Sequence, residues 1–201
     1  MTRIPYRSAD VLPQGIPPLN LFRMMAYSPS TLPHILSLGT AIFRDTSLPA
    51  HLRELLCLMN ANRLCCEYQW KQHVPTARQN NVSEQQITAL LAGDLSSDIW
   101  SSEEKALLAF IDQVIERPEI EDEVFENARA FFGDQSLVEL VTMQVGISKL
   151  LLIRHEAMLT NLILQGFYYS LARIATTFHV DVEQPNKEEP QKVQKVQIVR
   201  N

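Results

Sequence analysis

The chain has 201 residues, of which 46% are hydrophobic, and its formal net charge at pH 7 is −5. This length and composition allow one substantial buried core, so a single globular domain is expected. No block of Lys and Arg stands out along the chain. Because nucleic-acid binding needs a concentrated positive surface, that class of function is disfavoured.

Membrane and secreted classes are also disfavoured. No apolar run reaches the roughly 18–20 residues that cross a bilayer, and the richest one, residues 150–153, is followed directly by Arg154, His155 and Glu156. The N-terminal residues carry no apolar secretion core. The cysteines at positions 57, 65 and 66 are odd in number and two are adjacent, so they do not form a disulfide framework. A cytoplasmic protein is the expectation.

The first 47 residues are expected to form a proline-rich arm. Proline stands at positions 5, 13, 17, 18, 29 and 33, which predicts an extended segment broken by short helices over residues 19–26 and 32–44. Leu21, Phe22 and Met25 make the arm too apolar to stay in solvent. It is therefore expected to pack on the body or on a neighbouring subunit.

Residues 48–180 carry helical patterns, and signals for paired strands are weak throughout. Ser83 with Gln86 three residues later is a capping-box signature for the third helix of this body. The expected helices cover residues 49–63, 66–79, 83–91, 102–116, 121–132 (ended by Gly133) and 136–165, the last continuing to about residue 177. The fold class is all-α, and the polar segment 181–201 is expected to be a disordered tail.

One helical segment gathers groups suited to proton transfer. If residues 66–79 are helical, Cys66, Gln69 or Trp70, and His73 share one face. Glu54 lies twelve residues before Cys66, at the start of its own helix. A thiol, an amide, an imidazole and a carboxylate can thus converge, and a histidine with an ordinary pKa near 6.5 is the natural proton carrier among them.

These residues resemble the carboxymuconolactone decarboxylase family, which also contains the AhpD-type alkylhydroperoxidases. The pattern joins Glu54, Cys66 and His73 at the family's spacing, with Tyr68 and Trp70 between them, and the likeness spans about residues 48–131. The resemblance implies an AhpD-like helical bundle, a homo-oligomer, and neither metal nor organic cofactor. It implies catalytic roles for His73, Glu54 and Cys66.

The chain departs from both branches of the family at position 69. The peroxidases carry a second cysteine there, which resolves a sulfenic acid into a disulfide, and the decarboxylases usually carry glutamate. This chain has Gln69, which neither forms a disulfide nor exchanges a proton near neutral pH. Cys65 is about 100° round the helix from Cys66 and is badly placed to substitute.

The first hypothesis is therefore a decarboxylase-like, cofactor-independent lyase for a small acidic or lactone-type molecule. His73 would carry the proton, Glu54 would orient it, and Cys66 would line the pocket with three substrate-contacting residues: Gln69, Trp70 and Tyr68. The alternatives are a thiol peroxidase using Cys66 and a non-catalytic ligand-binding member. Three candidate anchors for an anionic substrate stay open: Arg53, Arg63 and the Arg154–His155 pair. No zinc-type spacing links Cys65 and Cys66 to His73, so no metal site is expected.

Overall fold

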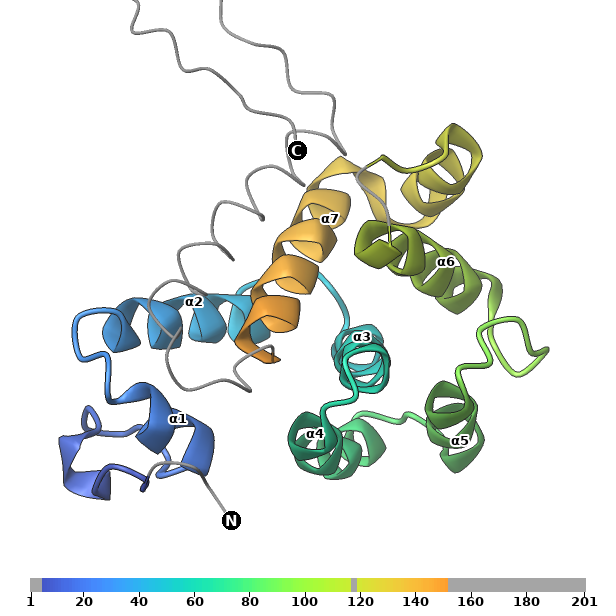
Figure 1. The fold of residues 1–201 in the computed structure, drawn as a ribbon. Helices are drawn as coiled ribbons and strands as arrows, with labels where there is room; N and C mark the ends of the chain where they lie inside the picture. The colour runs from blue at the N-terminus through green and yellow to red at the C-terminus, as the bar shows by residue number, and fades with distance from the viewer. Residues whose placement is uncertain (1–4, 117–118, 152–201) are drawn as a thin grey trace, which may run out of the picture.

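The computed structural model describes residues 5–116 and 119–151, with side chains described up to residue 144. Within these residues every regular element is helical, which confirms the all-α prediction. The elements are a 3₁₀ turn η1 (Ala9–Val11) and the helices α1 (Asn20–Met25), α2 (Leu32–Arg44), α3 (Ala50–Arg63), α4 (Glu67–Gln79), α5 (Glu84–Ala92), α6 (Ser102–Glu116) and α7 (Asp122–Leu151) (Figure 1). Expectations for residues 152–201, including the tail, lie outside the described part.

Helix α3 is the centre of the bundle. It packs against α4, α5, α6 and α7, and Figure 1 shows it surrounded by them. All residues from Glu54 to Ala61 are buried. A helix that is buried on every side normally carries apolar residues all round. The two polar exceptions, Glu54 and Asn60, therefore need partners inside the protein.

Asn60 finds its partner on α7. Its Nδ2 donates to Gln144 Oε1 at 2.6 Å, and Gln144 Nε2 donates back to Asn60 Oδ1 at 2.7 Å. Both side chains are buried. This reciprocal amide pair fixes how α3 and α7 lie against each other, because a buried amide that loses its partner is costly.

The helix ends follow the signals in the sequence. Ser83 and Gln86 form the predicted capping box, with Ser83 Oγ accepting from the Gln86 backbone N–H and Gln86 Oε1 accepting from the Ser83 N–H. Gly93 closes α5 in the left-handed region at φ 73°. Gly133 interrupts the helical backbone at the predicted position, with φ 67° and ψ 173°, a conformation that favours glycine. The element labelled α7 therefore consists of two helical segments that meet at a kink there, as the sequence predicts.

The N-terminal arm has a small apolar cluster of its own. Met25, Ala26 and Leu32 are buried there, separately from the main core, which takes up Ile42 at the end of α2. The backbone N–H of Leu21 donates to Tyr68 Oη at 3.4 Å, which joins α1 to α4. The division of the chain at residue 47 stays a prediction. Among the described residues, no helix is both long and apolar enough to cross a membrane.

Candidate functional site

A buried carboxylate and a half-buried imidazole face each other between α3 and α4. His73 Nδ1 lies 2.9 Å from Glu54 Oε2. The Glu54 side chain is 3% exposed and that of His73 is 21% exposed. Glu54 is thus buried in the core, whereas His73 reaches the surface, and this arrangement suits proton exchange between His73 and a bound molecule. The structure brings together these two residues that the sequence pattern links.

Cys57 completes a compact cluster with this pair. It follows Glu54 by three residues on α3, so both lie on the same face. Its Sγ, a carboxylate oxygen of Glu54 and a ring nitrogen of His73 all lie within 4.8 Å of one another. Burial raises the pKa of the Cys57 thiol well above its usual value, the Glu54 charge adds to this, and Arg53 opposes it. These three residues offer sulfur, oxygen and nitrogen atoms of the kinds that bind metal ions.

An aromatic residue from α2 closes one side of the cluster. The Phe43 ring stacks on His73 with ring centroids 6.0 Å apart and an interplanar angle of 24°. The guanidinium of Arg53 also lies over the Phe43 ring, 5.7 Å from its centroid. Helices α2, α3 and α4 therefore all contribute to one site, with a fixed positive charge beside it.

Two buried polar atoms near this cluster lack hydrogen-bond partners within the described part of the chain: Gln69 Oε1 and Arg53 Nε. Gln69 is 6% exposed and precedes His73 by one helical turn on α4. A buried acceptor and a buried donor left unpaired each cost free energy. Such atoms are explained when a bound molecule supplies the missing partners.

The remaining predicted residues lie differently. Cys66 is the N-cap of α4, with φ −96° and ψ 86°, so it precedes the regular helix. Among the described residues, the thiol that lies in the cluster with Glu54 and His73 is that of Cys57. Cys65 is exposed and adopts φ 49°. Trp70 is partly buried against the main core. Tyr68 is 37% exposed and accepts the hydrogen bond from Leu21.

The candidate anchor residues Arg53 and Arg63, and the neighbouring Glu67, differ in whether they already form an ion pair among the described residues. Arg63 pairs with Asp112, and also with Glu116 at 3.7 Å, so its charge is already balanced. Glu67 is exposed and pairs with Lys71 at 2.6 Å. Arg53, in contrast, makes no ion pair among the described residues. Arg154 and His155 lie outside the described residues.

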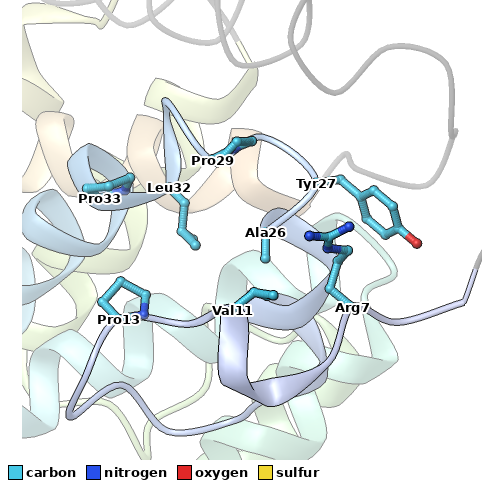
Figure 2. A pocket seen from close by; sticks show the side chains of 8 residues that line it. All are labelled: Arg7, Val11, Pro13, Ala26, Tyr27, Pro29, Leu32 and Pro33. Carbon is cyan, nitrogen blue, oxygen red and sulfur yellow. The ribbon is translucent and has the colours of Figure 1, made fainter.

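The hollow drawn in Figure 2 is a different place. It encloses about 280 Å³ between the first residues of the arm and the loop joining α1 to α2, with Pro13, Leu32 and Pro33 among its apolar walls. Arg7 lies over the Tyr27 ring at one edge, 5.5 Å from its centroid. None of Glu54, Cys57 and His73 lines it. The candidate chemistry is therefore in the helical body, away from this hollow.

Sequence reasoning missed Cys57 and Phe43. Cys57 had a usable signal, because a position three residues after Glu54 on a helix must share its face. Phe43 had no such signal, since its contact with His73 depends on where tertiary packing places the end of α2.

Comparisons with known proteins agree with this fold. Residues 29–112 match the model of the carboxymuconolactone decarboxylase family. A crystal structure of an Agrobacterium tumefaciens protein of unknown function, described as a candidate antioxidant defence protein AhpD, superimposes with a TM-score of 0.56. It shares 22% sequence identity and covers 79% of this chain and 94% of its own. A search of curated proteins found no match.

The family match spans the residues that build the site, from Phe43 through Glu54, Cys57 and His73. The structural likeness extends the same helical fold over most of the chain. Neither comparison separates the decarboxylase branch from the peroxidase branch. The segment that carries the site is thus similar to the carboxymuconolactone decarboxylase family, and the chain as a whole shares its helical fold with the Agrobacterium tumefaciens protein described as AhpD.

Proposed function

We propose that this chain is a cofactor-independent, decarboxylase-like enzyme that moves a proton on a small acidic or lactone-type organic molecule. The observation that carries the proposal is the 2.9 Å hydrogen bond between His73 Nδ1 and Glu54 Oε2, with Glu54 buried and His73 partly exposed. A carboxylate that accepts a hydrogen bond from one ring nitrogen fixes the orientation and the tautomer of the imidazole. Because Nδ1 is engaged by Glu54, Nε2 is the nitrogen that exchanges the proton with substrate.

Loss of CO₂ leaves a carbanion of enolate type, which must be stabilised and then protonated at carbon. His73 supplies that proton in this scheme. The guanidinium of Arg53, held over Phe43, supplies positive charge for a substrate carboxylate or the developing enolate. Gln69 contributes a buried amide oxygen that accepts from a substrate hydroxyl. Trp70, Tyr68 and Cys66 stay proposed contacts at the margin of the site.

The test is a screen of small carboxylic acids and lactones in D₂O, followed by nuclear magnetic resonance. The expected result is deuterium incorporation at a substrate carbon, or release of CO₂ with a deuterated product, that disappears in His73→Ala. Turnover that is unchanged in His73→Ala would rule out the proposed acid/base role.

A thiol peroxidase is the second candidate, favoured by the AhpD description of the similar Agrobacterium tumefaciens protein and by the partly exposed Cys66. Cys66 would form the sulfenic acid, and an external thiol would have to resolve it because position 69 is glutamine. Peroxide consumption measured with and without added thiol separates this candidate from the first.

We also propose a cytoplasmic homo-oligomer. Several large apolar side chains are exposed on the described surface, among them Leu38 of α2 at 46% and Val138 of α7 at 42%. Burial of such side chains between subunits is the usual outcome. Light scattering at micromolar concentration tests it, and a monomer would contradict it.

A further inference from the structure

We propose that Glu54, Cys57 and His73 form a binding site for a single thiophilic divalent metal ion of the zinc type. This inference goes beyond the proposed proton-transfer function and does not depend on it. It rests on three different ligand atoms that converge inside the protein, from two helices packed directly against each other.

The geometry is close to that of a three-ligand metal centre. The sulfur, carboxylate oxygen and imidazole nitrogen lie within 4.8 Å of one another, and Glu54 Oε2 and His73 Nδ1 are 2.9 Å apart. In a four-coordinate zinc site with bonds of about 2.0–2.3 Å, ligand atoms are roughly 3–4 Å apart. Small side-chain adjustments of the three ligands are therefore enough to admit the ion.

The charges also balance. A cysteine thiolate and a glutamate carboxylate together carry two negative charges, which neutralise a divalent ion where Cys57 and Glu54 are buried. On binding, the Cys57 S–H bond breaks, an S–metal bond forms, and the proton leaves to solvent. If Nδ1 becomes the ligand, its proton moves to Nε2, so the ring stays neutral overall.

The ligand set selects the kind of metal. One thiolate, one imidazole and one carboxylate suit zinc and its neighbours among the transition metals, whereas magnesium and calcium require oxygen ligands throughout. Three protein ligands leave a fourth position for water. Gln69 Oε1, a buried acceptor on the same face of α4 as His73, is suited to accept a hydrogen bond from that water.

Occupancy by metal excludes the proton-transfer state. The hydrogen bond between His73 Nδ1 and Glu54 Oε2 must open for both groups to turn to the ion. The metal-bound protein would therefore lose any activity that depends on His73 as an acid or base, and chelation would restore it.

The experiment is a titration of purified metal-free protein with Co²⁺ under anaerobic conditions, followed by competition with Zn²⁺. The expected result is saturation at one equivalent, a thiolate-to-cobalt charge-transfer band in the near ultraviolet, and its loss when Zn²⁺ is added. Cys57→Ser should abolish the band. His73→Ala and Glu54→Gln should weaken binding beyond the roughly 10–100-fold that loss of an outer hydrogen-bond partner costs.

The matched control is the double variant Cys65→Ser/Cys66→Ser, which leaves Cys57 as the sole thiol of the chain. This double variant must keep the band at the same stoichiometry. Its result remains informative even if Cys57→Ser fails to fold. Absence of saturable Co²⁺ and Zn²⁺ binding would overturn the proposal. So would loss of the band in the double variant, since the thiolate ligand would then be Cys65 or Cys66.

Discussion

His73 of α4 and Glu54 of α3 are joined by a 2.9 Å hydrogen bond that crosses between two packed helices. The carboxylate end is sealed in the core and the imidazole end is 21% exposed. Glu54 can therefore orient the His73 ring from inside the core, while His73 is the member of the pair that can meet solvent or substrate. The behaviour of variants at these two positions follows from this division of roles.

If His73 is the acid/base group, His73→Ala should lower turnover by about 10²–10⁴-fold with the fold intact, the usual scale for a positioned acid or base. Glu54→Gln should act in the same direction, because glutamine keeps the shape but removes the charge. The double variant should cost much less than the product of the single losses, since groups acting as one unit are not additive. Steady-state kinetics on a substrate from the screen measure all three.

The control for this series is Glu67→Gln. Glu67 is exposed on α4 and forms an ion pair with Lys71, one turn further along the same helix. Its replacement should be nearly silent. If Glu67 proved essential for turnover while Glu54 and His73 were dispensable, the site would lie on a different face of α4.

Peroxide reduction should be weak. Because Gln69 stands where a resolving cysteine is needed, a sulfenic acid formed on Cys66 has no neighbouring thiol at that spacing. We expect little peroxide consumption with dithiol partners, measured by a coupled peroxide assay. Robust turnover that vanishes in Cys66→Ser but persists in Cys65→Ser would move the peroxidase to first place.

The three thiols should differ sharply in reactivity in the folded, metal-free protein. Burial raises the pKa of Cys57 well above its usual value, so this thiol stays protonated, and it is also closed to reagents. Cys65 is exposed. Iodoacetamide at mildly alkaline pH should therefore modify Cys65 first and Cys57 only after unfolding, as peptide mass spectrometry will show. Equal labelling of Cys57 and Cys65 in the native state would contradict the buried placement.

Acid should weaken a contact between the arm and α7. Glu139 accepts from the Ser47 backbone N–H at 2.8 Å and from the Ser47 hydroxyl at 2.6 Å. Burial acts to raise the pKa of Glu139, but the hydrogen bonds from Ser47 and Gln135 outweigh it and leave the pKa lowered. Because the folded value lies below the unfolded one, the stabilisation is complete above the unfolded value of about 4.3 and is lost as pH falls through the folded value.

Ser47→Ala removes the hydroxyl donor and should therefore make the acid-induced fall in Tm shallower than in the parent chain. Thermal unfolding followed by circular dichroism at several pH values measures it. Ser37→Ala, an exposed serine on α2, is the matched control and should leave the pH profile unchanged. A parallel change in both variants would show that the Ser47–Glu139 contact does not carry the effect.

The amide pair should contribute to stability. Gln144→Met removes two buried hydrogen bonds to Asn60 and should lower the free energy of unfolding by about 1–3 kcal/mol. Urea denaturation measures the change. Gln85→Met, at an exposed position of α5, should stay within about 0.5 kcal/mol. Equal effects of the two substitutions would mean that the pair is not a specific contact.

Local signals in the chain were enough to predict the helical elements and the pairing of Glu54 with His73. Periodicity and capping residues act over a few residues, so the predicted bounds of α2 match the observed ones and the capping box at Ser83 and Gln86 forms as expected. The spacing between Glu54 and His73 also pointed to one site, because a short connection leaves two consecutive helices as neighbours.

Packing between helices determines which other groups join that site. Cys66 precedes the first turn of α4 because the chain turns there, with Cys65 in the left-handed region, so a helical-face argument does not apply to it. Cys57 lies beside His73 because α3 and α4 pack with their polar positions facing each other. Phe43 reaches the same ring only because tertiary packing places the last turn of α2 beside His73. Contacts between helices depend on crossing geometry, which no single helix encodes.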